Sequence, residues 1–160
     1  MKISEKQQKM NVKKRTYYQE AIRYIDKAKD LLKKSPKEGN YYTDIKYVKS
    51  AGRNAFVGIE KAAKWLIELN GIEIQKDADV WEIKKALTKI NSGSYIPYLW
   101  FNDFYTYFYL TVYLRGHNNA RMINVTLKDA KIFISFLKQY NETAVYKKGA
   151  TTKKKNNTIK

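Results

Sequence analysis

A regular spacing of small and apolar residues through 43–70 constrains the fold more than any other feature. A small or apolar side chain recurs there every three or four positions, which is the period of one helix face. The middle of the stretch is small, so a neighbouring helix can approach it closely. The pattern therefore predicts a long helix on the seam of a bundle. The residues on this face are Ile45, Val48, Gly52, Ala55, Ile59, Ala62, Leu66 and Leu69.

Four further segments have the same period, and polar breaks separate them. We therefore expect an all-α protein, an up-down bundle of four long helices with one short additional helix at 80–90. No pair of strands is apparent, and a polar linker is expected between the first two helices. The other three predicted helices cover 14–34, 97–115 and 126–140.

Helix-terminal residues support several of these boundaries. Pro36 stops the first helix, because a proline disfavours helical geometry in the residue before it. Asp79 and Glu82 have the spacing of a capping box at the start of the short helix. Thr126 and Asp129 approximate the same arrangement and predict the start of the last helix. A polar break is expected at 91–94.

The helix predicted at 97–115 is dominated by aromatic residues. Between Tyr95 and Leu114 the only formal charge is Asp103, and such apolar character on every side is typical of a helix buried on most faces. The stretch is long enough to consider a membrane span. Asn102, Asp103 and the tyrosines would then each need a partner in lipid, which is costly. We expect no membrane association.

Charge is concentrated at the two ends of the chain. The sequence has 32 Lys and Arg against 15 Asp and Glu, for a net charge of +17. Residues 1–15 hold six bases and one acid, and residues 147–160 hold six lysines and no acid. Neither end has apolar periodicity, so we expect a disordered basic tail at 1–13 and another, Lys-rich, at 142–160. The bundle domain is predicted at 14–141.

The basic charge has two interpretations. It can form a surface for polyanions, in which case lysine-rich tails predict weak, sequence-indifferent binding of nucleic acid. It can equally reflect a coding sequence rich in A and T, since 27 of the 32 bases are Lys and only five are Arg. Arg is the residue that forms bidentate contacts with phosphate and guanine. The beginning of the chain has no apolar stretch of the secretory kind, so a cytoplasmic location is expected.

Candidate reactive groups are few. The chain has no cysteine and one histidine, which excludes disulfides and thiolate sites, and we expect neither a metal nor a cofactor. The one concentration of polar groups is the segment 115–121, with Arg115, His117 and Arg121. Together with Arg53, these are the candidate residues for binding an anion or nucleic acid. The alternative is that the segment is an ordinary polar connection between helices.

Asp103 is a second candidate because it is isolated in an apolar helix. It could be a carboxylate with a perturbed pKa in a cleft. Alternatively it pairs with a base such as Arg53 or Arg23, or it lies on the exposed edge of its helix. The surrounding aromatic residues could stack on bases, although their helical spacing favours packing.

Two segments resemble HEPN-type domains. Residues 51–72 resemble the second helix of such domains, with small residues, a Glu-Lys-Ala core and an ending on leucines and glycine, and 126–140 resembles their final helix. The resemblance implies a helical bundle, often dimeric, that is either an RNase or a non-catalytic partner. HEPN RNases carry an Arg and a His with four to six residues between them, which would place the Arg at 110–112, and no Arg occupies these positions. The matching residues are Glu60, Lys61, Ala62, Lys64, Leu66 and Gly71.

The sequence thus predicts a non-catalytic, HEPN-like binding or interaction module. The partner would be a second copy in a dimer, another protein or RNA. One alternative is a metal-independent RNase of toxin–antitoxin or defence type that uses His117 with Arg115 or Arg121. The other alternative is a small structural protein of the cytoplasm.

Overall fold

The structure, a computed structural model, describes the backbone of residues 5–90 and 96–154. The environments of the side chains are described for Glu5 and for residues 17–90 and 96–139. The polar break predicted at 91–94 lies outside the described residues. The outermost parts of both predicted tails also lie outside them.

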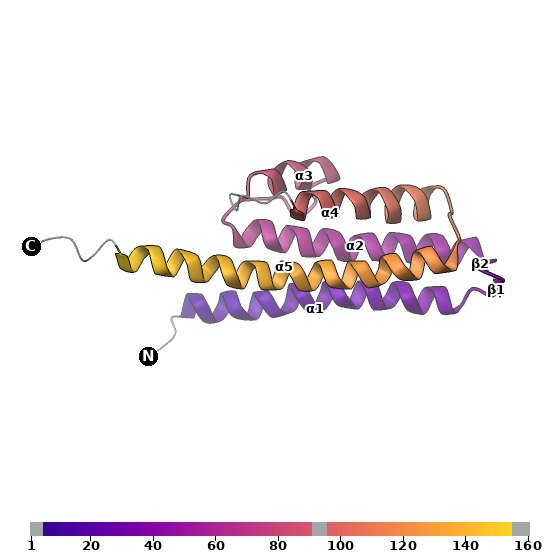
Figure 1. Ribbon diagram of the computed structural model, residues 1–160, viewed down its shortest axis with the longest axis horizontal. Coiled ribbons are helices and arrows are strands. Elements are labelled where there is room, and N and C mark those ends of the chain that lie inside the picture. Colours follow the sequence, from indigo (N-terminus) through magenta and orange to yellow (C-terminus); the bar gives the residue numbers. More distant parts are fainter. Residues whose placement is uncertain (1–4, 91–95, 155–160) are drawn as a thin grey trace, which may run out of the picture.

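Most of the described chain is helical, and the predicted all-α bundle is confirmed. Three long helices and one composite helix run side by side along the long axis, and the short helix α3 lies against the composite one (Figure 1). The composite helix consists of α4 and the π-helix η1, which follow each other without a break. The elements are α1 (Glu5–Lys33), β1 (Lys37–Glu38), β2 (Tyr41–Tyr42), α2 (Ile45–Leu69), α3 (Val80–Thr88), α4 (Ile96–Phe104), η1 (Tyr105–Leu114) and α5 (Ala120–Lys154).

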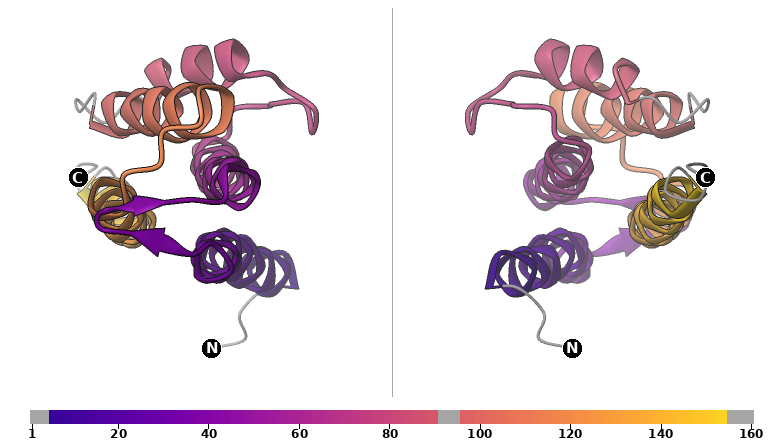
Figure 2. Two further views of the ribbon diagram at one scale, coloured as in Figure 1. Left: turned by 90° about the vertical axis from the view of Figure 1, so that its right-hand side faces the viewer. Right: turned by 90° about the vertical axis from the view of Figure 1, so that its left-hand side faces the viewer.

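Helix α2 is the central element of the bundle. It contacts α1, α3, α4, η1 and α5, and the end-on views show it between α1 and the α4–η1 layer (Figure 2). Because it is covered from several sides, its buried surface extends beyond the predicted stripe to Phe56, Ala63 and Trp65. Asp79 and Glu82 form the predicted capping box at the start of α3.

Two glycines let neighbouring helices approach α2 closely. A Cβ at Gly52 would lie 2.7 Å from Val112 Cγ1 and 2.9 Å from the carbonyl oxygen of Phe108 on η1. A Cβ at Gly58 would lie 2.8 Å from the carbonyl oxygen of Ala21 on α1. The small residues of α2 therefore set the distances to both neighbours, as the sequence pattern predicts.

The helix predicted at 97–115 differs from expectation in one respect. Its second half is a π-helix, in which the Arg115 N–H donates to the Leu110 carbonyl, five residues back. Within it the rings of Tyr105 and Tyr109 stack, with centroids 5.5 Å apart. The exposed residues of the whole helix lie along one stripe, and the other positions are buried or half-buried, in line with the expected burial on most faces. The stripe consists of Ile96, Leu99, Asp103, Thr106 and Leu114.

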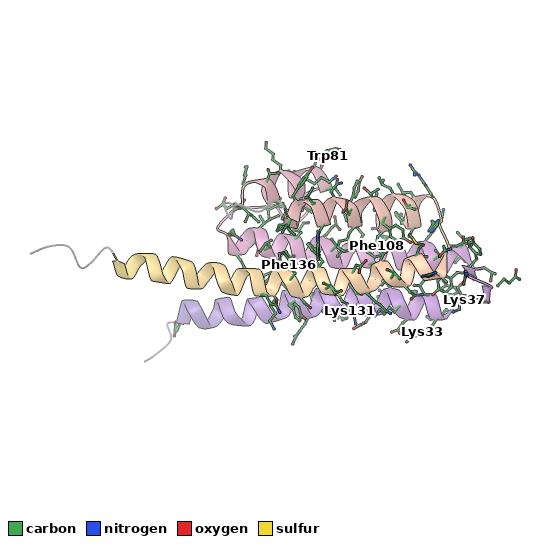
Figure 3. The ribbon with its side chains drawn as sticks, viewed as in Figure 1. Lys33, Lys37, Trp81, Phe108, Lys131 and Phe136 are labelled. Atoms are coloured by element: carbon green, nitrogen blue, oxygen red, sulfur yellow. The ribbon has the colours of Figure 1, made fainter. Side chains whose placement is uncertain are left out.

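None of the helices in the described ranges combines the length and apolar character needed to cross a bilayer. The most exposed large apolar side chain among the described residues is Trp81, at 72%. It lies on the outer side of α3, across the bundle from Lys33 (Figure 3).

A small β-hairpin replaces the linker predicted between the first two helices. Lys37 pairs with Tyr42 and Glu38 with Tyr41, and Gly39 turns the chain with a φ of +57°. Glycine and asparagine in a two-residue connection are a hairpin signal. The two strands have only two residues each, so they are too short to show the alternating pattern of a strand in the sequence.

The first and last helices extend beyond the predicted bounds. Helix α1 begins at Glu5, so the backbone is helical over part of the segment expected as a disordered tail. Helix α5 begins at Ala120 and continues to Lys154. Its cap is Asn119, whose side-chain oxygen accepts the Met122 N–H at 3.0 Å. The capping role predicted for Thr126 is wrong, because its hydroxyl donates to the Met122 carbonyl inside the helix at 2.9 Å.

Candidate functional site

The basic residues predicted as a site lie on separate elements. Arg115 is the exposed C-terminal cap of η1, and Arg121 is exposed in the first turn of α5. Arg53 is exposed on α2, with its guanidinium 5.5 Å from the centre of the Tyr113 ring. Within the described part of the chain, no hydrogen bond, ion pair or ring contact joins Arg115 or Arg121 to His117.

His117 is half-buried and held by its surroundings. Its backbone N–H donates to the Thr111 carbonyl at 3.0 Å, and its ring meets the edge of the Tyr107 ring with centroids 6.1 Å apart. The preceding Gly116 has a φ of +74°, a conformation that favours glycine. These contacts give the segment a structural role as the connection between η1 and α5.

The rest of this connection supports the hairpin. The Asn118 side-chain amide donates to the Tyr42 carbonyl at 2.7 Å, and the Tyr42 N–H donates to the Asn118 carbonyl at 3.0 Å. The Ala120 N–H donates to the Asn40 carbonyl at 2.7 Å. The Asn118 side chain and the backbone of the segment thus satisfy backbone groups of the hairpin.

Helix α5 carries a second apolar stripe besides the one that fills the core. Ile123, Leu127 and Ile134 belong to the core stripe and are at most 1% exposed. The second stripe has the same three-and-four spacing, but its members are half-buried or exposed. Met122 is 52%, Val125 49% and Ile132 58% exposed. The stripe consists of Met122, Val125, Asp129, Ile132 and Phe136.

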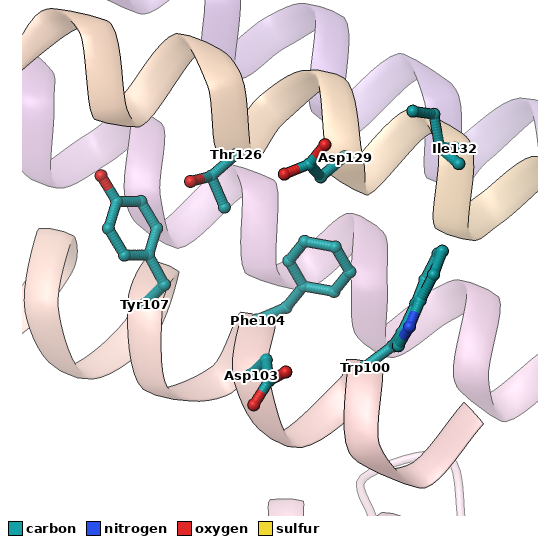
Figure 4. Close-up of a pocket in the computed structure, with 7 residues that line it drawn as sticks. All are labelled: Trp100, Asp103, Phe104, Tyr107, Thr126, Asp129 and Ile132. Carbon is teal, nitrogen blue, oxygen red and sulfur yellow. The ribbon is translucent and has the colours of Figure 1, made fainter. Parts of the chain in front are cut away.

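This second stripe borders a cleft between α5 and the composite helix α4–η1. The volume of the cleft is about 330 Å³. Figure 4 shows the two walls, one from each helix, with Trp100 closing one end and Tyr107 the other. The lining residues are Trp100, Asp103, Phe104 and Tyr107 from α4–η1, and Thr126, Asp129 and Ile132 from α5.

Aromatic contacts fix the spacing of the two walls. Trp100 lies 5.4 Å from Phe133 and 5.6 Å from Phe136, measured between ring centroids. Phe104 lies 5.3 Å from Phe133 and stacks on Phe108 at 5.7 Å. Aromatic pairs at such distances stabilise packing beyond simple area burial. The cleft therefore has a rigid aromatic floor.

The cleft is acidic in a strongly basic chain. Asp103 and Asp129 are both exposed and come from opposite walls. Neither forms an ion pair with a described residue, so Asp103 occupies the exposed edge of its helix rather than pairing with Arg53 or Arg23. The carboxylates leave the cleft suited to a positively charged group.

Tyr107 adds a polar group at one end of the cleft. Its hydroxyl is buried beside Thr126 (Figure 4) and completes no hydrogen bond with a described group. Burial raises the pKa of Tyr107. The neutral phenol can donate to or accept from a bound molecule.

The sequence pattern indicates only part of this cleft. The second stripe of α5 has a regular spacing, but Asp129 interrupts its apolar character. The opposite wall depends on how the composite helix packs on α2, which the sequence pattern does not specify. In the described ranges, no group of three or more His, Cys, Asp or Glu side chains is placed to hold a metal ion.

The fold and the cleft define a helical-bundle protein with an open groove between two of its helices. The chain belongs to the family described as "Domain of unknown function (DUF5618)", whose sequence model matches residues 16–139. No curated protein matches it.

A solved structure, described as a protein of unknown function from Dyadobacter fermentans, is similar to this chain. The two are 28% identical, and the match covers 79% of this chain and 97% of the other, with a TM-score of 0.66. Neither description names an activity or partner, so the resemblance to HEPN-type domains stays a prediction.

Proposed function

We propose that this protein is a non-catalytic, HEPN-like binding module whose cleft holds an amphipathic helix from a partner protein. The observation that carries the proposal is the exposed second stripe of α5 beside an open cleft. Helices that bind in grooves place anchors at intervals of three and four residues. Met122, Val125 and Ile132 offer a matching row of apolar contacts, and Trp100 and Phe104 supply the floor.

The charge of the cleft favours a basic partner helix. Asp103 and Asp129 lie on opposite walls without ion-pair partners among the described residues, so a Lys or Arg of the guest helix can lie between them. Complementary charges of this kind give specificity and speed association.

A second copy of this chain fits the cleft less well. Two copies that each carry +17 repel one another. A symmetric pairing through the second stripe would also place Asp129 near its own equivalent, because an isologous interface brings the same surface patch together. We therefore assign the cleft to a different protein, and self-association becomes an outcome that the test detects.

Fluorescence anisotropy with two labelled helical peptides tests the proposal. Both carry leucines along one face, one with flanking lysines and the other with flanking glutamates. We expect the lysine peptide to bind more tightly, and Ile132→Ser to weaken its binding at least tenfold, or about 1.4 kcal/mol. Leu114→Ser is the matched control, since Leu114 has a similar exposure and lies outside the cleft.

Three results would contradict the proposal. The first is equal binding of the lysine and glutamate peptides, which would show that the carboxylates play no part. The second is equal loss of binding in the Ile132 and Leu114 variants, which would place the contact elsewhere. The third is a wild-type dimer in analytical ultracentrifugation that Ile132→Ser abolishes, which would assign the cleft to a second copy.

A further inference from the structure

A second cavity lies on the other side of α5, where α1, the hairpin and α5 meet. Its volume is about 380 Å³. Lys29 and Lys33 from α1, Lys37 from β1 and Lys128 from α5 line it. Figure 3 shows Lys33 and Lys37 together at the hairpin end of the bundle. Four lysines from three elements thus line one cavity.

Most of this positive charge is not neutralised by described residues. Lys33 pairs with Asp30 at 2.9 Å, and the nearby Asp26 is engaged by Lys131 at 2.7 Å. No ion pair within the described part of the chain involves Lys29, Lys37 or Lys128. Burial lowers the pKa of Lys29 and the adjacent Lys131 lowers it further, whereas Asp26 offsets part of this fall.

The wall between the lysines is rigid and offers a hydrogen-bond donor. Tyr42 is only 5% exposed, and its hydroxyl oxygen accepts a bond from the Asn124 side-chain amide at 3.0 Å. The same amide donates to the Ala120 carbonyl at 2.8 Å. The hydroxyl hydrogen of Tyr42 has no acceptor among the described residues and can point to a bound anion.

We propose that this cavity binds a small phosphorylated compound with a diphosphate group. A phosphate monoester carries about −1.5 to −2 charges at neutral pH, which leaves the three unpaired lysines incompletely balanced, whereas a diphosphate matches them. The volume is within the range of small-molecule sites, roughly 300–1,000 Å³. Lysine binds phosphate as a point charge. Nucleic acid fits less well, because Tyr42 is buried and offers no open ring face to stack a base.

Isothermal titration calorimetry with inorganic pyrophosphate tests this site, with inorganic phosphate and sulfate as weaker comparators. We expect one pyrophosphate per chain, at least tenfold tighter than phosphate. Lys29→Gln and Lys128→Gln should each weaken binding at least tenfold, whereas Lys85→Gln, which removes the same charge from an exposed position on α3, should change it less than twofold. Thermal unfolding of each variant verifies that it is folded.

The Ile132→Ser variant should bind pyrophosphate as tightly as the wild type, because Ile132 lines the proposed helix-binding cleft and not this cavity. It therefore distinguishes the two sites. Equal weakening by all three lysine variants would overturn the proposal, because the binding would then follow net charge alone. Pyrophosphate bound no more tightly than sulfate would also overturn it. A single-stranded RNA could instead displace pyrophosphate, and its binding could weaken more than that of pyrophosphate in the Lys29→Gln and Lys128→Gln variants. That result would identify the site as a nucleic-acid contact.

Discussion

Gly52 on α2 lies directly against Val112 on η1, with no room for a side chain between them. A methyl group at Gly52 would come within 2.7 Å of Val112 Cγ1 and 2.9 Å of the Phe108 carbonyl oxygen. The second of these atoms belongs to the backbone of a helix and cannot rotate away. This contact places η1 on α2, and the position of η1 in turn forms one wall of the cleft.

Gly52→Ala should therefore destabilise the protein, although alanine ordinarily favours a helix over glycine by about 1 kcal/mol. We expect a net loss of about 1–3 kcal/mol, because an overpacked contact forces the backbone to shift. Urea unfolding measures the change. Val112→Ala combined with Gly52→Ala should recover part of the loss. A rise in the unfolding midpoint of the single variant would show that α2 and η1 are not in close contact.

Lys84 on α3 contacts the Trp81 ring of its own helix and the Tyr105 ring of η1. Its ammonium lies 4.5 Å from the centre of the Tyr105 ring and 5.0 Å from that of Trp81, and the residue is 8% exposed. A double-mutant cycle with Lys84→Gln and Tyr105→Leu should give a coupling of about 0.5–2 kcal/mol in the free energy of unfolding. Additive effects of the two substitutions would refute the interaction.

Glu60 should make stability depend on pH in an unusual direction. Burial raises the pKa of its carboxyl above the ordinary 4.5, although Lys64, Arg53 and Lys61 offset part of the rise. The folded protein then holds this proton more tightly than the unfolded chain, so ionisation costs stability above the folded-state pKa. Glu60→Gln should stabilise the protein at pH 7, and the gain should disappear below about pH 4.5.

Thermal unfolding at pH 4 to 7 measures this difference, with the exposed Glu73→Gln as control. The control should show no gain at neutral pH. A Glu60→Gln variant that is less stable than the wild type at pH 7 would contradict this account. It would mean that the attraction of the Glu60 carboxylate to the three cations exceeds the cost of burying its charge.

His117 should not support RNA cleavage. It is held by Thr111 and Tyr107, and no described contact joins it to Arg115 or Arg121. We expect a labelled single-stranded RNA to remain intact with the wild type, and to bind weakly with a steep loss as salt rises. Cleavage that disappears in His117→Ala would favour the RNase alternative over a binding module.

The sequence pattern predicts structure well where residues close together in the chain determine it. The capping box of Asp79 and Glu82 depends on local spacing alone, and the small residues of α2 forecast close packing. The π-helix cannot be read from spacing, because the same aromatic run satisfies an α-helical period as well. The spacing of Thr126 and Asp129 imitates a capping box, but the Thr126 hydroxyl donates to the Met122 carbonyl inside α5, and Asn119 is the actual cap.

The candidate site was predictable only in part. The composition of the polar segment 115–121 suggests a site, yet its Asn118 side chain bonds to the hairpin, a contact between segments far apart in the chain. The cleft needs two walls, and only the stripe through Val125 and Ile132 is visible in a single helix. The opposite wall follows from the packing of α4–η1 on α2, which depends on Gly52.

Methyl-resolved NMR during titration with the lysine-flanked helical peptide tests the central claim most directly. The methyl signals of Met122, Val125 and Ile132 should shift or broaden together and saturate with one peptide per chain, while that of Ile22 on the α1 side stays in place. Shifts confined to α1, or no change at the three α5 methyls at saturating peptide, would contradict the assignment of the cleft as a helix-binding site.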